Sequence, residues 1–207
     1  MSTATGKRGR VVEAPPRGVA GIVTEIRAEI AACRLCAAMK PFRKRPPESF
    51  GTTKTGYLFV GEAPGRDGPV FAEALAEVGD ERFRELSDLF FLSDAVRCRP
   101  RHKTQKGKTR TPSPAECRTC NPYLQLEIRA LRPRLVVAAG TKAAQAVLGL
   151  PLRIEDVHGR RQRVRDVEVL PLLLPSHHVA LRRAGMTAES YRRWLIGLFG
   201  ALIDQLD

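Results

Sequence analysis

Four short apolar runs, separated by stretches with helical spacing, place the strongest constraint on the fold of this chain. The runs are Tyr57–Val60, Leu89–Leu92, Leu135–Ala138 and Leu170–Leu174. Around them, apolar residues recur at the helical period in Gly18–Ala32, Pro69–Val78, Ser113–Leu131, Ala143–Leu148 and Ala188–Leu206. Apolar runs of this length are typical of strands that are buried on both faces. Strands that alternate with helices predict an α/β fold with a largely parallel sheet.

Unusual residues follow three of the predicted strands. They are Gly61–Gly65, Ser93–Asp94 and Ser176–His178. In parallel α/β sheets, binding sites gather beyond the carboxyl ends of the strands. These three segments are therefore expected to meet at one site.

The chain length and its amino terminus suggest one folded domain with a short extension. A chain of 207 residues can bury a core of its own. Residues 1–17 are rich in basic side chains and prolines, which predicts a flexible basic arm ahead of a domain over residues 18–207. No apolar stretch is long enough to span a bilayer, and the amino terminus lacks the apolar core of a secretory signal. We therefore expect a cytoplasmic protein without a membrane partner.

The charge balance points to a polyanionic partner. Lys and Arg number 35 against 22 Asp and Glu, which gives a formal net charge of +13. One segment holds seven basic residues and no acidic one: Arg97, Arg99, Arg101, Lys103, Lys106, Lys108 and Arg110. This segment is either a phosphate-contacting loop or a solvated surface loop. Aromatic residues make up only 6% of the chain, which argues against an extended platform for stacking bases.

Five cysteines suggest a metal site rather than a disulfide framework. Two CxxC pairs, Cys33/Cys36 and Cys117/Cys120, flank Cys98. By spacing alone, two CxxC pairs are typical of structural zinc. An iron–sulfur cluster on Cys33, Cys36, Cys98 and one residue of the second pair fits as well, and buried free thiols remain a third interpretation. Spacing does not choose between iron and zinc.

Several motifs resemble those of one enzyme family. Phe59–Gly65 resembles the first motif of the uracil-DNA glycosylase superfamily in its iron–sulfur family 4 form. Its central region is similar, in order and spacing, to Ala95–Pro100, Arg110–Glu116, Cys120–Leu124, Leu131–Val137 and Gly140. The resemblance extends from Cys33 to Trp194 and also includes the related iron–sulfur family 5.

This resemblance implies a fold, an activity and a partner. The fold is a three-layer α/β/α sandwich around a short, mostly parallel sheet of four strands. The activity is that of a monofunctional DNA glycosylase in base excision repair, which hydrolyses the N-glycosidic bond of uracil or of another deaminated or damaged base. The partner is DNA with a flipped base, bound by a monomer.

The resemblance also assigns a cofactor and a DNA-contacting surface. It implies a 4Fe-4S cluster on Cys33, Cys36, Cys98 and Cys120, with Cys117 as an extra thiol beside it. Phosphate contacts would then come from six basic residues: Arg99, Arg101, Lys103, Lys106, Lys108 and Arg182.

For the chemistry, the resemblance points to the segment after the last predicted strand. Pro175–Arg182 aligns with the second family motif, and His178 falls on its histidine, the expected donor to O2 of the leaving base. If this segment is extended, the neighbouring His177 points the other way. Glu62 and Asp67 are the candidate carboxylates for activating water. The flipped base is expected to lie against the first motif, on Gly61, Ala63, Pro64 and Gly65.

Several positions depart from the family pattern, among them Val179 and Ala180, which replace the Pro and Ser of the second motif. Asp94 stands where family 4 has an asparagine that reads the uracil edge, and an ionised aspartate only accepts hydrogen bonds. Phe71 is the nearest match to the phenylalanine that stacks on the base. These departures leave two further interpretations open: a glycosylase fold that binds DNA without efficient catalysis, and a zinc-ribbon module.

Overall fold

The structure is a computed structural model that describes residues 18–36, 39, 49–64, 67–102, 104 and 108–207. The predicted basic arm, residues 1–17, lies outside these residues. So do three predicted site residues, Gly65, Lys103 and Lys106.

One twisted sheet forms the centre of the molecule. Its strand order is β1-β3-β2-β4-β6-β5. The four inner strands are mutually parallel: β3 (Phe91–Asp94), β2 (Tyr57–Gly61), β4 (Leu135–Ala139) and β6 (Val167–Leu172). Short antiparallel strands, β1 (Phe50–Gly51) and β5 (Gln162–Val164), cover the two edges. The predicted parallel four-stranded sheet is therefore confirmed as the core, and within the described part of the chain the strand number is corrected to six. Strand β1 was missed because its two residues leave no recognisable pattern, and β5, with three residues, was not counted as a strand of the sheet.

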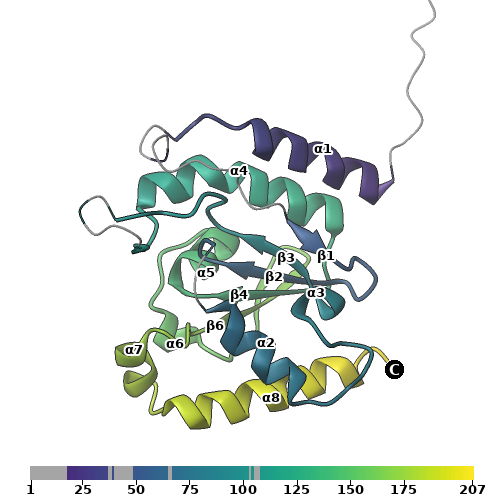
Figure 1. Cartoon of the computed structure of the whole chain (residues 1–207), viewed down its shortest axis with the longest axis vertical. Helices are drawn as coiled ribbons and strands as arrows, with labels where there is room; N and C mark the ends of the chain where they lie inside the picture. The colour runs from purple at the N-terminus through teal and green to yellow at the C-terminus, as the bar shows by residue number, and fades with distance from the viewer. Residues whose placement is uncertain (1–17, 37–38, 40–48, 65–66, 103, 105–107) are drawn as a thin grey trace, which may run out of the picture.

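Helices cover both faces of the sheet, which confirms the three-layer α/β/α arrangement (Figure 1). On one face, α4 (Pro114–Leu131) packs between α1 (Val19–Ala32) and α5 (Thr141–Leu148). On the other face, α2 (Gly68–Ala76) packs against α8 (Ala188–Asp204). Short helices α3 (Leu86–Leu89), α6 (Ile154–Val157) and α7 (His178–Arg183) complete the connections.

The second strand begins later than its apolar run predicts. Leu86–Leu89 forms the helical turn α3, since the backbone N–H of Glu85 donates to the Asp88 carboxylate in a capping box. The strand therefore starts at Phe91 and ends at Asp94. Asp94 thereby becomes the last residue of β3 and lies opposite Gly61, the last residue of β2.

The parallel register brings the predicted strand ends to one edge. Gly61 pairs with Asp94, and Ala139 of β4 pairs with Leu172 of β6. The strands themselves are almost fully buried, as expected for a parallel sheet covered on both faces. Polar side chains that must reach a ligand are therefore confined to the residues that end or follow these strands.

Candidate active site

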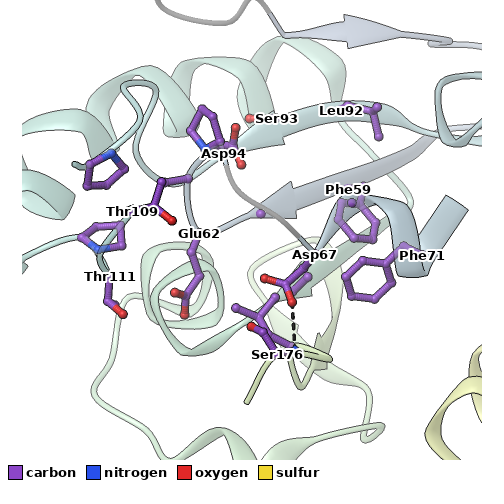
Figure 2. A pocket seen from close by; sticks show the side chains of 18 of the residues that line it. Phe59, Glu62, Asp67, Phe71, Leu92, Ser93, Asp94, Thr109, Thr111 and Ser176 are labelled. Carbon is purple, nitrogen blue, oxygen red and sulfur yellow. Dashed lines mark hydrogen bonds between the residues drawn. The ribbon is translucent and has the colours of Figure 1, made fainter. Parts of the chain in front are cut away.

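A cavity of about 480 Å³ opens at the carboxyl ends of β2, β3, β4 and β6 (Figure 2). Its wall includes Gly61, Glu62, Ala63 and Pro64 after β2, Asp67 and Phe71 at α2, Asp94 at β3, Lys108 and Arg110 before α4, and Ser176 and His177 after β6. The three segments expected to meet do so here. The volume falls within the range typical of small-ligand pockets.

Glu62 is a buried carboxylate in this wall. It is 7% exposed, and its Oε1 accepts a hydrogen bond from the backbone N–H of Lys142 at 2.9 Å. Burial raises the pKa of Glu62, while the Lys142 amide and nearby His177 act in the opposite direction. Gly140 makes room for this side chain: it has a φ of +99°, and a Cβ there would lie 2.5 Å from Glu62 Cγ. The glycine is thus required both by its backbone conformation and by the carboxylate beside it.

Asp67 ties the first motif to the segment after β6. Its Oδ1 accepts a hydrogen bond from the backbone N–H of Ser176 at 2.9 Å, drawn as the dashed line in Figure 2. Figure 2 also shows that the carboxylates of Asp67 and Glu62 point into the same space. The two predicted carboxylates therefore share one cavity.

The two histidines are placed differently from the expectation. His177 lines the cavity, whereas His178 is exposed as the first residue of α7 and does not line it. The expectation that His177 points away rested on an extended chain after the last strand. The chain instead turns at Pro175–Ser176 and enters a helix, so the alternation of an extended segment does not apply.

Asp94 places a carboxyl in the wall of the cavity. It is half-buried, and its Oδ1 lies 2.5 Å from the position that a Cβ on Gly61 would take. Among the described residues, none forms a hydrogen bond with this carboxyl. Burial raises the pKa of Asp94 to about 7, with Arg97 lowering it and Glu127 raising it. The side chain can therefore change charge near neutral pH.

A buried polar network lies behind Asp94. Arg97 is 3% exposed and forms an ion pair with Glu127 of α4, which is fully buried. Ser49 Oγ donates to Glu127 Oε1 at 2.5 Å, and Ser93 Oγ donates to Glu127 Oε2 at 2.8 Å. The interpretation of Arg97 as part of a phosphate-contacting loop is corrected, because its guanidinium is enclosed by this network. Glu127 was not predicted, although an acid on the buried stripe formed with Leu124 was a signal for it.

Four cysteines line a separate small cavity. Cys33, Cys36, Cys98 and Cys120 share it, whereas Cys117 does not line it. The backbone N–H of Arg97 donates to Cys120 Sγ at 3.3 Å. Burial raises the pKa of the Cys120 thiol to about 11, so a thiolate there needs a bound cation. Within the described residues, no three His, Cys, Asp or Glu side chains are arranged to hold a single metal ion.

Comparison with known proteins places this architecture in a family. The profile of the uracil DNA glycosylase superfamily matches residues 48–195, which includes both motifs at the cavity. The chain belongs to the uracil DNA glycosylase superfamily. It is 30% identical over 191 residues to the type-4 uracil-DNA glycosylase of Pyrobaculum aerophilum, covering 84% of this chain and 91% of that protein.

Two further relatives carry the same name. The type-4 uracil-DNA glycosylase of Archaeoglobus fulgidus is 31% identical over 157 residues, which cover 70% of this chain and 73% of the relative. The type-4 uracil-DNA glycosylase of Sulfurisphaera tokodaii is 27% identical over 168 residues, which cover 75% of this chain and 73% of that relative. Similarity to superfamily members therefore extends over most of the fold described above.

The two ends of the basic segment, which we call the basic ribbon, are held together beside the cavity. Arg101 and Thr109 form an antiparallel bridge, and the backbone N–H of Arg110 donates to Pro100 O at 3.0 Å. Arg110 also forms an ion pair with Glu116, with Nη2 and Oε1 2.6 Å apart. The exposed basic residues at this end of the molecule include Arg99, Lys108 and Arg182, and Arg101 is half-buried.

The aromatic wall of the cavity belongs to the core of the superfamily fold. Phe71 is 1% exposed, because its ring packs edge-to-face on Phe59 with centroids 5.1 Å apart. Both rings line the cavity, as Figure 2 shows. Phe71 is therefore held in one orientation.

Among the described residues, no helix has the length and apolar character needed to cross a membrane.

Proposed function

We propose that this protein is a DNA glycosylase that hydrolyses the bond between deoxyribose and uracil, or another deaminated or damaged base. One observation carries the proposal: the first and second family motifs meet at a single cavity that also holds two carboxylates and a histidine. A base in duplex DNA is out of reach until it swings out of the stack. The cavity at the strand ends supplies a place for that base.

The two carboxylates suit the sugar side of the reaction. In hydrolysis, the C1′–N bond breaks and its electron pair leaves with the base, while a water oxygen bonds to C1′ and gives up a proton. We assign Glu62 and Asp67 to this water and to the developing positive charge on the sugar. The raised pKa of Glu62 makes it a stronger proton acceptor than an ordinary carboxylate.

The leaving base needs a donor at O2, where negative charge develops. Motif resemblance assigns this role to His178, whereas the cavity wall contains His177. We propose that this adjacent pair supplies the donor and that the base lies against the first motif with its edge toward Asp94. Single His177→Ala and His178→Ala variants identify which imidazole acts.

DNA would lie across the basic end of the molecule. Arg99, Lys108 and Arg182 are the exposed cations we assign to phosphate contacts, with Arg101 beside them. We propose the same role for Lys103 and Lys106, which lie outside the described residues. The protein is proposed to act as a monomer in the cytoplasm, with residues 18–207 as its catalytic domain and residues 1–17 as a basic arm.

We propose that the cysteine cavity is the site of an iron–sulfur cluster. Four thiols line one space and a backbone amide donates to one of them, as expected around cluster sulfurs. Cys33, Cys36, Cys98 and Cys120 would hold a 4Fe-4S cluster. Bound there, it would join the end of α1, the segment after β3 and α4, which is a structural role. Iron analysis and visible absorbance test this: Cys120→Ala should lose the iron, and the matched variant Cys117→Ala should keep it.

Excision from defined oligonucleotides tests the proposed activity. Purified protein is incubated with strands that carry uracil, hypoxanthine, xanthine or ethenocytosine, and abasic sites are counted after alkali. We expect abasic product from at least one of these bases. Salt-sensitive binding to the same strands without abasic product from any base would instead support a DNA-binding protein that has lost catalysis. The departure at Asp94 is the observation that favours this second candidate.

A further inference from the structure

We propose that Asp94 reads the edge of the flipped base and accepts uracil only as the neutral carboxylic acid. The inference rests on the proposed glycosylase function and deepens it, because it makes the choice of base depend on pH through one side chain. Asp94 is a specificity-determining residue in this account.

The position of Asp94 is fixed by the sheet. It ends β3, pairs with Gly61 of the first motif, and faces the cavity that Glu62 and Asp67 also enter (Figure 2). The missing side chain of Gly61 leaves the space that the Asp94 carboxyl occupies, with Oδ1 2.5 Å from where a Cβ would be. The carboxyl is therefore held at the cavity wall.

The hydrogen-bonding capacity of this carboxyl is not used by the described residues. Nearby Ser93 donates to Glu127 instead, at 2.8 Å. A half-buried polar group without a partner is costly unless a ligand satisfies it. An edge of a base that enters the cavity is the ligand this geometry fits.

The protonation state decides which edge fits. Uracil presents an N3–H donor between two carbonyl acceptors. A carboxylate has acceptors only, so one oxygen can take N3–H while the other lies against a carbonyl oxygen. A carboxylic acid presents one donor and one acceptor side by side, as an asparagine amide does. The neutral acid can therefore bond N3–H and a neighbouring carbonyl together, whereas the anion repels that carbonyl.

The surrounding charges allow the neutral form near neutral pH. Behind Asp94, Arg97 is neutralised by its ion pair with Glu127. Among the described residues that line the cavity, the other charged or titratable groups are Glu62, Asp67, His177, Lys108 and Arg110, of which Arg110 is paired with Glu116. Burial is the largest influence and raises the pKa of Asp94 to about 7. Below that pH the acid predominates, and above it the anion does.

The test compares the pH dependence of uracil excision by the wild type and by Asp94→Asn. Single-turnover rates are measured on a uracil-containing single strand from about pH 5.5 to about pH 8.5. An amide keeps one donor and one acceptor at every pH. Relative to the variant, the wild-type rate should therefore fall by about tenfold for each pH unit above the Asp94 pKa. At the acid end, the two rates should agree within about threefold.

A matched control removes the same charge elsewhere. Asp166→Asn lies in the exposed turn between β5 and β6, and should reproduce the wild-type profile. Thermal unfolding of each variant checks that the fold is retained. Wild-type and Asp94→Asn profiles of the same shape would overturn the inference while leaving the glycosylase function intact.

A binding measurement keeps the inference testable if no base is excised. Affinity for a uracil-containing strand, relative to the same strand with thymine, is measured at about pH 6 and about pH 8. The uracil preference of the wild type should fall between these two pH values, and that of Asp94→Asn should not. Absence of excision by both proteins, together with this binding pattern, would reject the proposed function alone. A uracil preference that is equal at both pH values in the wild type would reject the role of Asp94.

Discussion

At the residue scale, two glycines decide where the acidic groups of the cavity can lie. Gly61 leaves room for the Asp94 carboxyl, and Gly140 leaves room for Glu62. At Gly61 the crowded atom is the end of a short side chain, whereas at Gly140 a left-handed backbone conformation adds a second constraint. Substituting either glycine should therefore displace a carboxylate. The effect on excision can then be measured separately from the effect on the free energy of unfolding.

Gly140→Ala should disable the site more than it disturbs the fold. The positive φ alone costs about 1–3 kcal/mol of unfolding free energy, and the new Cβ forces Glu62 out of position. Gly149→Ala is the control, because it has a similar φ of +73° and nothing within 4 Å of the new Cβ. Urea unfolding and excision rates are measured for both. Excision should fall at least about tenfold in Gly140→Ala only; full activity in that variant would show that Glu62 is dispensable.

Asp94 should also make stability depend on pH. Its pKa of about 7 in the folded state exceeds the ordinary value of 3.8, so ionisation favours the unfolded chain. The stability contributed by the neutral acid is present below the ordinary value and is lost as the pH rises toward 7. Asp94→Asn removes this loss and should be more stable than the wild type at about pH 8, by about 1 kcal/mol or more, but not at about pH 4. If the melting temperatures of the wild type and Asp94→Asn differ by the same amount at both pH values, the raised pKa of Asp94 is contradicted.

At the element scale, the ion pair between Arg97 and Glu127 connects α4 to the segment after β3. Both side chains are almost completely buried, and Ser49 and Ser93 satisfy the remaining oxygen positions of the carboxylate. A buried pair of this kind is costly to break, because the remaining charge has no water around it. The network fixes β3, and with it Asp94, relative to the helical layer.

Glu127→Gln should be strongly destabilising. It leaves the Arg97 guanidinium buried without a counter-charge, which costs about 3–5 kcal/mol. Glu168→Gln is the matched control, since its ion pair with Arg161 is exposed and contributes about 0–1 kcal/mol. Chemical denaturation measures both. Equal small losses in the two variants would show that the buried pair does not hold this region together.

Elements with strong local patterns could be predicted from the sequence, and the turns between them could not. The four inner strands and the long helices follow from apolar runs and helical spacing. Helix α7 was missed because six residues carry too little periodicity. Because helix α7 was not predicted, the direction of the His177 side chain was predicted wrongly. The candidate site was predicted from strand ends and motifs, whereas the enclosure of Arg97 depends on long-range packing that composition does not reveal.

At the scale of the whole molecule, charge and layering favour one end of the sheet as the DNA-binding face. The net charge is +13, and the cavity, the basic ribbon and α7 all lie beyond the carboxyl ends of the strands. The amino ends of the same strands lie at the opposite edge. A polyanion that enters the cavity would therefore be held by cations at this end.

Lys108→Gln should weaken DNA binding in a salt-dependent manner. Loss of one phosphate contact lowers the slope of log affinity against log salt concentration by about 1. Lys54→Gln removes the same charge in the loop before β2, at the amino end of the strand, and should leave the slope unchanged. Fluorescence anisotropy at several salt concentrations gives both slopes. Equal effects of the two substitutions would mean that the charge acts through the whole surface rather than through this face.

The most direct test of the account is to detect the free base. A uracil-containing strand is incubated with the wild-type protein, and the products are separated and weighed by mass spectrometry. The account predicts free uracil together with an unbroken strand that bears one abasic site, and much less of both from the double variant His177→Ala/His178→Ala. Intact substrate after incubation with folded, iron-loaded protein, or equal release by the double variant, would contradict it.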